Sequence, residues 1–479
     1  NKTTTTTKIV FLPFISSHNK YIMVPTPDAS NEYLLTLRAV RESCFRVKDA
    51  GARNGLSHFD VDPSKLQDVV QFVVALIKRD FDNPSSMPVH GIWRHFETGR
   101  PRIQHLLNSW SSLGFDATEQ TRRVLDLFVV GVLLDTDADH VWSFREKATG
   151  RTYKRAEGIA VAVLELFTDG AFSSDVNQPH RVDSEALINL SMDTLQKGFQ
   201  VDQECNALIG LDDRLELLRN LGQALQEHAD FFQQTGPVPR PGNLMDFLLE
   251  HKDTIKTKKG ALIRLETLWP VVLTMGELFV TDRADGRGGI PDLGDVYPST
   301  ATQFNNPQSP DHYVPFHKMS QWLVYSIIEP MERLLGATIE GTELLTPLPE
   351  FRNAGLLIDT GLLTLKQHEY ARGIENYHKN SLLPGQPKIE VAPMFEMNDP
   401  VIIEWRALTT AYLDIVAERV RDVLRLNRNK LTLTRVMDGA TWAAGRELAE
   451  ISRPNTQEPP IIVKVRIKKI YRTVMERNL

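Results

Sequence analysis

The stretch DHYVPFHKMSQWLVYSIIEP, residues 311 to 330, is the segment from which the fold can be worked outward. Pro315 fixes φ near the helical value, and Pro330 cannot continue an uninterrupted ladder of backbone hydrogen bonds, so one short helix is expected between them. Trp322, Leu323 and the two isoleucines that follow make this segment too apolar for a solvated surface. The sequence therefore predicts a core helix with a polar first turn.

That first turn gathers side chains that can hold a small molecule. His317 and Gln321 lie four residues apart on one helix face, and Lys318, Trp322 and Tyr325 follow one another on the adjacent face. A cation, an imidazole and an amide at the start of a buried helix are typical of a pocket floor. A core helix whose first turn only reaches water explains the pattern equally well.

Composition narrows the class of protein. The chain has 479 residues and a formal net charge of −6, and its lysines and arginines are dispersed among acidic residues, which leaves no track for a nucleic-acid backbone. Cys44 and Cys205 are its only cysteines, so a disulfide framework or thiolate metal site is not expected. No run approaches the roughly 20 apolar residues that span a bilayer. We expect a soluble, cytoplasmic protein that binds neither nucleic acid nor membrane.

Helical periodicity dominates the chain and sets the expected fold class. Apolar side chains recur with helical spacing in several segments, residues 69–77, 122–134, 155–167, 213–232 and 401–426. Strand-like alternation is confined to short pieces such as the tail. The sequence predicts a mainly α, multi-helix globular fold with few short strands.

Pro- and Gly-rich stretches indicate four parts of the chain. Residues 1–31 are a variable, Thr-rich extension without a signal-peptide pattern. Residues 32–236 and 242–460 are an N-terminal and a C-terminal helical unit, and the stretch PVPRPG, residues 237 to 242, is the expected linker between them. The C-terminal unit carries the expected site, and residues 461–479 form a variable tail.

No signature of a bound cofactor or metal is found. A Gly-rich phosphate loop and a nucleotide fingerprint are both missing. His90, His95 and His105 are five and ten residues apart, which does not stack two ligands on one helix face, so a loop packed by Trp93 and Phe96 is the better interpretation. We expect neither a cofactor nor a metal site.

Acidic side chains at the ends of apolar runs are candidate site residues. Asp135 follows the apolar stretch 122–134, in a loop that lacks the central Gly and closing Glu of a calcium site. Asp359 ends a short apolar run near Arg352 and is a candidate base or cation stabiliser; an Asp that caps the next helix is the slightly stronger alternative. Glu404 and Arg406 open the helix of residues 401–426, where exposed charge is the simpler interpretation.

Several motifs together resemble one known family. These are WRHFE (93–97), FSSD (172–175), RVD (181–183), VPFHKMSQWL (314–323), LPEFRN (348–353), EWRALT (404–409) and TWAAGR (441–446). Over about residues 33 to 460 the chain resembles the uracil catabolism protein 4 family, also described as a domain of unknown function. The resemblance implies a role in non-reductive uracil breakdown, in which a ribosylurea-type intermediate must lose urea, and contact with other enzymes of that pathway.

A second resemblance concerns two short motifs. Asp-x-x-Val-Pro, which begins at Asp311, and Glu-x-Arg, which begins at Glu404, are similar to motifs of the queuosine salvage family of helical nucleotide N-glycosidases. This resemblance implies a distant relation to DNA glycosylases, with Asp311 as the catalytic carboxylate.

The two resemblances suggest an N-ribosyl hydrolase that releases urea from a ribosylurea-phosphate-type substrate. Cleavage of the C–N bond builds positive charge on the sugar, so a carboxylate beneath the ring lowers the barrier. Asp359, Asp311 and Glu404 are the candidates, and His317 is the expected proton donor to urea.

The remaining candidates are assigned to substrate binding. Gln321 pairs with the ureide, Trp322 or Tyr325 walls the sugar, and the cations bind the 5′-phosphate, namely Lys318, Arg352 and Arg406. Lys318 as a Schiff-base nucleophile is an alternative. The alternative function is a non-catalytic partner or regulator of the ring-opening enzyme.

Overall fold

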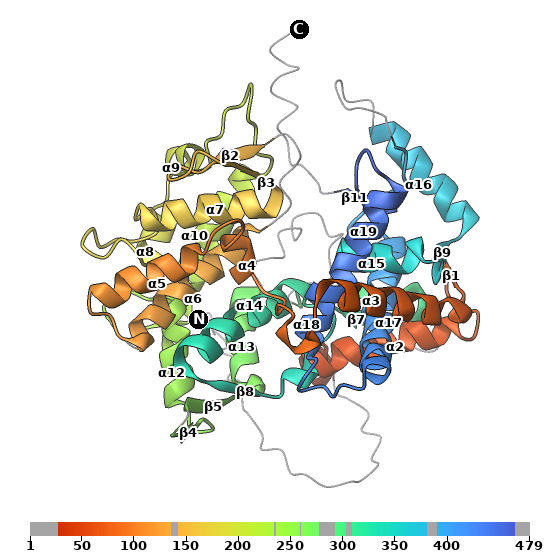
Figure 1. Ribbon diagram of the computed structural model, residues 1–479, viewed down its shortest axis with the longest axis horizontal. Helices are drawn as coiled ribbons and strands as arrows, with labels where there is room; N and C mark the ends of the chain where they lie inside the picture. Colours follow the sequence, from red (N-terminus) through yellow and green to blue (C-terminus); the bar gives the residue numbers. More distant parts are fainter. Residues whose placement is uncertain are drawn as a thin grey trace, which may run out of the picture.

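The protein is mainly α, as the periodicity predicts. The computed structural model describes residues 27–135, 142–233, 236–258, 260–276, 293–302, 309–380 and 390–464. Within these ranges many helices are joined by loops and a few three- to five-residue strands (Figure 1). No helix in the described ranges is both long enough and apolar enough to cross a membrane.

The helices account for most of the architecture. In the first half of the chain they are α1 (Pro27–Leu34), α2 (Leu37–Gly51), α3 (Leu66–Asp80), α4 (Trp93–Phe96), α5 (Arg102–Ser112), α6 (Ala117–Leu134), α7 (Arg155–Thr168), α8 (Ser184–Ile188), α9 (Met192–Gly198), α10 (Leu211–Glu227) and α11 (Ala229–Phe232). In the second half they are α12 (Leu244–Glu250), α13 (Leu265–Gly276), α14 (Lys318–Leu335), α15 (Phe351–Asp359), α16 (Gln367–Asn380), α17 (Pro400–Leu424), α18 (Leu433–Val436) and α19 (Ala443–Ser452). A π-helical turn, Met437–Trp442, joins α18 to α19.

The strands form small separate sheets. Antiparallel pairs are β1 (Phe59–Val61) with β9 (Leu363–Leu365), β2 (Ser143–Arg145) with β3 (Thr152–Lys154), and β6 (Val296–Pro298) with β7 (Tyr313–Pro315). β10 (Met394–Glu396) pairs in parallel with β11 (Ile462–Lys464), and β5 (Gly260–Arg264) lies between β4 (Ile255–Thr257) and β8 (Thr338–Glu340). Residues 465–479 of the expected tail lie outside the described ranges.

Two large hydrophobic core clusters account for most of the buried side chains of the described residues. The first joins buried side chains mostly between Ile92 and Leu348. The second joins residues 40–87 to residues 301–316 and 354–461. Figure 1 accordingly shows α2 and α3 beside α17, on the opposite side of the molecule from α5 to α10. The limits of these clusters do not coincide with residues 236 to 242.

The bounds of the central helix α14 differ from the expected ones. Pro315 lies in β7, paired with Val296, and the helix begins only at Lys318, after His317 adopts a left-handed φ of 44°. Pro330 lies inside the helix, which continues to Leu335. Proline removes one ladder hydrogen bond, but its neighbours Ile327, Ile328 and Met331 are buried in the first core cluster, and this packing maintains the helix.

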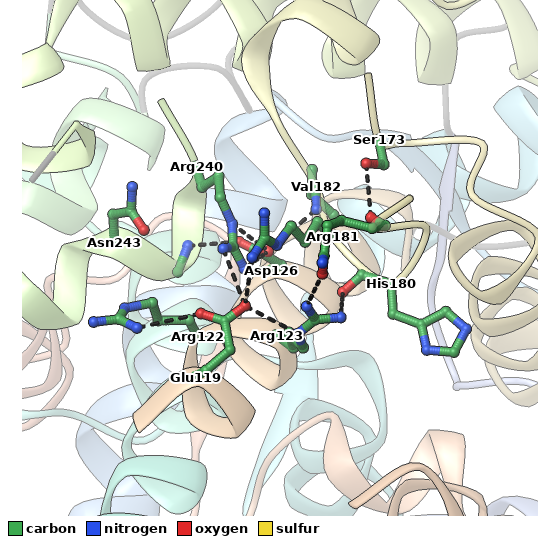
Figure 2. A network of polar contacts seen from close by, with 12 residues as sticks. Glu119, Arg122, Arg123, Asp126, Ser173, His180, Arg181, Val182, Arg240 and Asn243 are labelled. Carbon is green, nitrogen blue, oxygen red and sulfur yellow. Dashed lines mark hydrogen bonds and ion pairs between the residues drawn. The ribbon is translucent and has the colours of Figure 1, made fainter. Parts of the chain in front are cut away.

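A network of charged side chains fixes the expected linker onto α6. Asp126, which is fully buried, accepts hydrogen bonds from the backbone N–H groups of Val182 (3.1 Å) and Gly242 (2.8 Å) and from Arg240 Nη2 (2.7 Å). Two turns earlier on α6, Glu119 pairs with Arg122, Arg123, Arg181 and Arg240 (Figure 2). A Cβ on Gly242 would lie 2.2 Å from the Arg122 carbonyl oxygen. Residues 240–243 are therefore held tightly against the helix.

Candidate functional site

Two histidines lie against Trp322 of α14, where the two core clusters meet. The ring centroid of His90 is 4.6 Å from that of Trp322, and that of His95 is 6.0 Å away. Met87, three residues before His90, belongs to the second core cluster, whereas Ile92 belongs to the first. The imidazoles therefore lie on the border between the two cores.

The backbone around His90 is fixed by close contact with α14. A Cβ on Gly91 would lie 3.4 Å from the Tyr325 carbonyl oxygen, so the chain runs directly along the helix. The N–H of Ile92 donates to Ser326 Oγ (3.2 Å), and the N–H of His90 donates to the Thr434 carbonyl (3.2 Å). These bonds set the position from which the imidazole projects.

Two carboxylates from distant segments flank His90. Glu350, which immediately precedes α15, has Oε1 3.5 Å from His90 Nε2, and Asp438, in the π-helical turn, has Oδ1 3.4 Å from His90 Nδ1. Arg94 forms an ion pair with Asp438 on the other side. π-helical turns are rare and occur frequently at functional sites. We call His90, His95, Asp135, Trp322, Glu350 and Asp438 the histidine cluster.

His95 and Asp135 form the more exposed side of the histidine cluster. Asp135 Oδ2 is 3.4 Å from His95 Nδ1. The side chains of His95 and Glu350 are 24% and 19% exposed, whereas those of His90 and Asp438 are 5% and 3% exposed. Solvent therefore reaches one imidazole and one carboxylate, and the inner pair lies behind them.

Electrostatics keeps His90 and Glu350 charged at neutral pH. Burial acts to lower the pKa of His90, but the carboxylates of Glu350 and Asp438 outweigh it and raise the pKa to about 9. Burial likewise acts to raise the pKa of Glu350, but His90, Lys318 and His95 lower it to about 2. The pKa of His95 is also raised, because Asp135 and Glu157 outweigh its burial. A protonated imidazole thus faces an ionised carboxylate.

The hydrogen-bonding capacity of the cluster is incompletely used. His90 Nε2 and His95 Nδ1 are buried atoms without a hydrogen-bond partner among the described residues, and the nearest carboxylate oxygens lie 3.5 and 3.4 Å away, beyond the usual hydrogen-bond range. Buried polar atoms without partners are uncommon in folded proteins. Such atoms are available to a ligand.

Other features of the described surface are weaker candidates. Hollows of about 280 Å³ beside Ser173 and about 320 Å³ beside Ala261 are each lined by a single charged side chain and no histidine. Among the described residues, no group of three His, Cys, Asp or Glu side chains is placed to hold a metal ion. The histidine cluster is therefore the strongest candidate site.

Four of the residues singled out from the sequence lie in or beside this cluster. Trp322 and Asp135 belong to it, and Lys318 acts electrostatically on Glu350. Tyr325 lies edge-on to His90 at 6.2 Å, but its hydroxyl donates to the Thr346 carbonyl (2.9 Å). Tyr325 thus packs against the cluster, and its hydroxyl makes a structural bond.

Two polar residues of the first turn of α14 are occupied by structural bonds. Gln321 is fully buried, and its amide group bonds the Phe316 carbonyl (3.0 Å) and the Thr346 N–H (2.8 Å). His317 Nε2 lies 2.8 Å from the Leu34 carbonyl, and burial lowers the pKa of its imidazole. A neutral, bonded imidazole is poorly suited to donate a proton to urea.

The three carboxylates proposed from the sequence lie apart from the cluster. Asp359 pairs through both oxygens with Arg453 (2.6 and 2.9 Å). Glu404 accepts hydrogen bonds from three consecutive backbone N–H groups, of residues 57 to 59, at 2.9–3.0 Å. The side chain of Asp311 is 61% exposed and lies 3.4 Å from Arg46.

The two arginines proposed for phosphate binding differ in their surroundings. Arg406 pairs through both terminal nitrogens with Asp295 (2.9 and 2.8 Å) and stacks on Phe316 at 3.9 Å, so its charge is already neutralised. Arg352 donates to the Gln457 carbonyl oxygen and lies among other arginines. Only Arg352 remains a suitable anion ligand.

Sequence reasoning missed four members of the cluster. His90 and His95 were weighed only as metal ligands along one helix, and Glu350 was only part of the motif LPEFRN. The motifs WRHFE and LPEFRN that carried the resemblance do contain His95 and Glu350, and this was the signal that could have found them. Nothing in the sequence pattern marked Asp438.

The chain is a mainly α protein in which histidines and carboxylates cluster between two hydrophobic cores. The family described as protein of unknown function (DUF1688) matches residues 33–466, and the chain belongs to that family. The Lachancea kluyveri protein named uracil catabolism protein 4 is 36% identical over 446 residues, which cover 91% of this chain and 98% of that protein. The Schizosaccharomyces pombe protein urg3 is 34% identical over 440 residues, which cover 90% and 96%. The family expected from the motifs is thus confirmed.

Proposed function

We propose that this protein acts in uracil catabolism as an N-ribosyl hydrolase that releases urea from a ribosylurea-phosphate-type intermediate. The name of the Lachancea kluyveri relative supports the pathway. The observation that carries the reaction is the partly exposed Glu350 carboxylate, whose pKa is held at about 2 beside two imidazoles.

Glu350 is the proposed carboxylate because the reaction builds positive charge on the sugar. As the bond between C1′ and the urea nitrogen breaks, an ionised carboxylate beside the ring stabilises that charge and accepts a proton from the attacking water. The hydroxide of that water adds to C1′. Asp359 and Glu404 are less suitable, since their oxygens already accept strong hydrogen bonds.

His95 is the proposed proton donor to the leaving group. Urea leaves poorly as an anion, so its nitrogen must be protonated as the bond breaks. The raised pKa of His95 favours the protonated imidazole, and its side chain reaches solvent. The proton that Glu350 gains from water returns to His95 through solvent, which completes the cycle.

The inner residues orient these two groups. His90, held between Glu350 and Asp438, keeps the Glu350 carboxylate ionised and in place. The Trp322 ring is buried beside both imidazoles and holds their orientation. His90 and Asp438 are therefore positioning residues.

The direct test is urea release from ribosylurea 5′-phosphate by the purified protein. Glu350→Gln keeps the shape of the side chain and removes its charge, so the rate should fall about 10³-fold. The matched control is Glu375→Gln on α16, whose side chain is 64% exposed and pairs with Lys379 one turn along the helix; its rate should equal that of the wild type. A wild-type protein that never releases urea would contradict the proposal and favour the partner role.

A further inference from the structure

The carboxylate of Asp135 is nearly buried, yet it has no well-placed hydrogen-bond donor among the described residues. Asp135 is the C-cap residue of α6, and its side chain is 12% exposed. Within the described ranges its one ion-pair contact is with His95 Nδ1, at 3.4 Å, which is beyond the usual hydrogen-bond range. Both oxygens of an ionised carboxylate accept hydrogen bonds, and burial without donors is unfavourable. These oxygens are therefore open to donors from a ligand.

Other aspartates of similar burial find their donors inside the chain. The Asp399 side chain is 15% exposed, and both of its oxygens accept hydrogen bonds from Arg372, at 2.6 and 2.8 Å. The Asp359 side chain is 6% exposed, and both of its oxygens accept from Arg453, at 2.9 and 2.6 Å. Burial alone therefore does not explain why the oxygens of Asp135 lack close donors.

The charges around Asp135 favour a neutral donor over an ion. An anionic ligand would meet the carboxylates of Asp135 and Glu350, and a cationic ligand would meet the imidazole of His95. Hydroxyl groups carry no charge and donate strong hydrogen bonds to a carboxylate. Two hydroxyls on neighbouring carbons match the two oxygens of one carboxylate, so a vicinal diol is the ligand group that fits best.

The position of Asp135 fits the hydroxyls of a sugar whose C1′ lies at Glu350. Under the proposed function His95 protonates the nitrogen on C1′, and Asp135 lies 3.4 Å from His95. The 2′-hydroxyl is on the neighbouring carbon, so it lies beside the leaving nitrogen and within reach of a group that contacts His95. A separate observation indicates a ligand here, because His90 is 4% exposed and its Nε2 atom has no hydrogen-bond partner in the described part of the chain.

We propose that Asp135 binds the 2′- and 3′-hydroxyls of the substrate ribose, which makes the protein selective for ribosyl over 2′-deoxyribosyl compounds. The place of the sugar rests on the proposed function. Hydrogen bonds to the 2-hydroxyl strengthen as positive charge develops on a sugar ring, so this contact assists the reaction as well as binding. The competing role for Asp135 is to orient the His95 imidazole, as carboxylates do in hydrolase triads.

Calorimetry with ribose 5-phosphate and 2-deoxyribose 5-phosphate tests this without any turnover. The wild-type protein should bind ribose 5-phosphate at least about tenfold more tightly, since one hydrogen bond to a charged group accounts for such a ratio. Asp135→Ala should bring the ratio close to one by weakening the binding of ribose 5-phosphate. Asp135→Asn keeps one acceptor oxygen and should give an intermediate ratio. Both variants should fold, because the Asp135 carboxylate makes no close bond within the described chain.

Asp169→Asn is the matched control, because Asp169 is the C-cap residue of α7 as Asp135 is of α6, and its side chain is 61% exposed. Its ratio of affinities should equal that of the wild type.

The outcomes separate the diol contact from the proposed function. No binding of either sugar phosphate, no preference for ribose 5-phosphate, or the same preference in Asp135→Ala would overturn the diol contact even if urea is released. If Asp135→Ala instead slows urea release equally from the ribosyl and 2′-deoxyribosyl substrates, Asp135 only orients His95 and the proposal is wrong. A ribose preference that depends on Asp135, in a protein that releases no urea, would support the diol contact while the proposed reaction fails.

Discussion

The network around Asp126 and the histidine cluster both bury charges between segments far apart in the chain, but they use them differently. Asp126 accepts hydrogen bonds of 2.7–3.1 Å from two backbone N–H groups and from Arg240 (Figure 2). In the histidine cluster the contacts of His90 and His95 are 3.4–3.5 Å, and ring nitrogens lack partners within the described ranges. Fully bonded charges hold a fold together, whereas incompletely bonded ones are free to act on a ligand.

The largest expected effect is a loss of stability when the Asp126 network is broken, which should exceed the loss from a change in the histidine cluster. Asp126→Asn removes the closer of the two carboxylates that pair with buried Arg240 and leaves only Glu119 at 3.3 Å, so the free energy of unfolding should fall by about 3–5 kcal/mol. Denaturant titration measures this, with Asp169→Asn, at a side chain 61% exposed, as the control. Glu350→Gln in the same assay should cost less, about 1–3 kcal/mol, because it removes one of the two carboxylates that hold His90 protonated. A larger loss from Glu350→Gln than from Asp126→Asn would break the comparison.

A smaller effect is expected at Asp359, whose carboxylate is fully bonded, like that of Asp126, and not incompletely bonded like the groups of the histidine cluster. Asp359→Asn weakens a bidentate pair with Arg453 and should reduce the free energy of unfolding by about 2 kcal/mol. Urea release per folded molecule should change less than twofold. A 10²-fold loss of that rate would instead restore Asp359 as the reacting carboxylate.

The smallest effect concerns pH. The pKa of His90 is raised to about 9 in the folded state, above its ordinary value of about 6.5, so its contribution to stability is complete below pH 6.5 and is lost as pH rises through 9. Asp438→Asn removes one of the two carboxylates and should lower that upper limit by about one pH unit, equivalent to about 1.4 kcal/mol. NMR titration of the imidazole, with denaturant titration from pH 6 to 10, measures both. An unchanged titration would show that Asp438 does not act on His90.

Local patterns predicted the helices well, because amphipathic periodicity is a property of neighbouring residues. Residues 122–134 and 155–167 fall within α6 and α7, and the expected helix from residue 401 is α17. The bounds of α14 were wrong, because strand pairing at Pro315 and core packing around Pro330 depend on distant residues.

The site was only partly predictable for the same reason. Trp322 and Asp135 were singled out from their own surroundings, and the structure places both in the cluster. Glu350 and His90 come together across about 260 positions of sequence, and no periodicity connects them. The pairing of Asp359 with Arg453 was equally invisible, since a carboxylate after an apolar run looks the same whether or not an arginine meets it.

The π-helical turn sets the angle at which the segment α18 to α19 meets two neighbours, His90 and Arg352. A π turn contains one residue more than an α turn, so it offsets the angular register of everything that follows it. Asp438 lies in the turn and faces His90, and Arg446 lies beyond it, next to Arg352. Deleting one residue from Met437–Trp442 would rewind this segment as ordinary α-helix and rotate one end against the other by roughly 100°. Asp438 and Arg446 could then no longer both face their present neighbours, so this single extra residue sets the angle between the two ends of the segment.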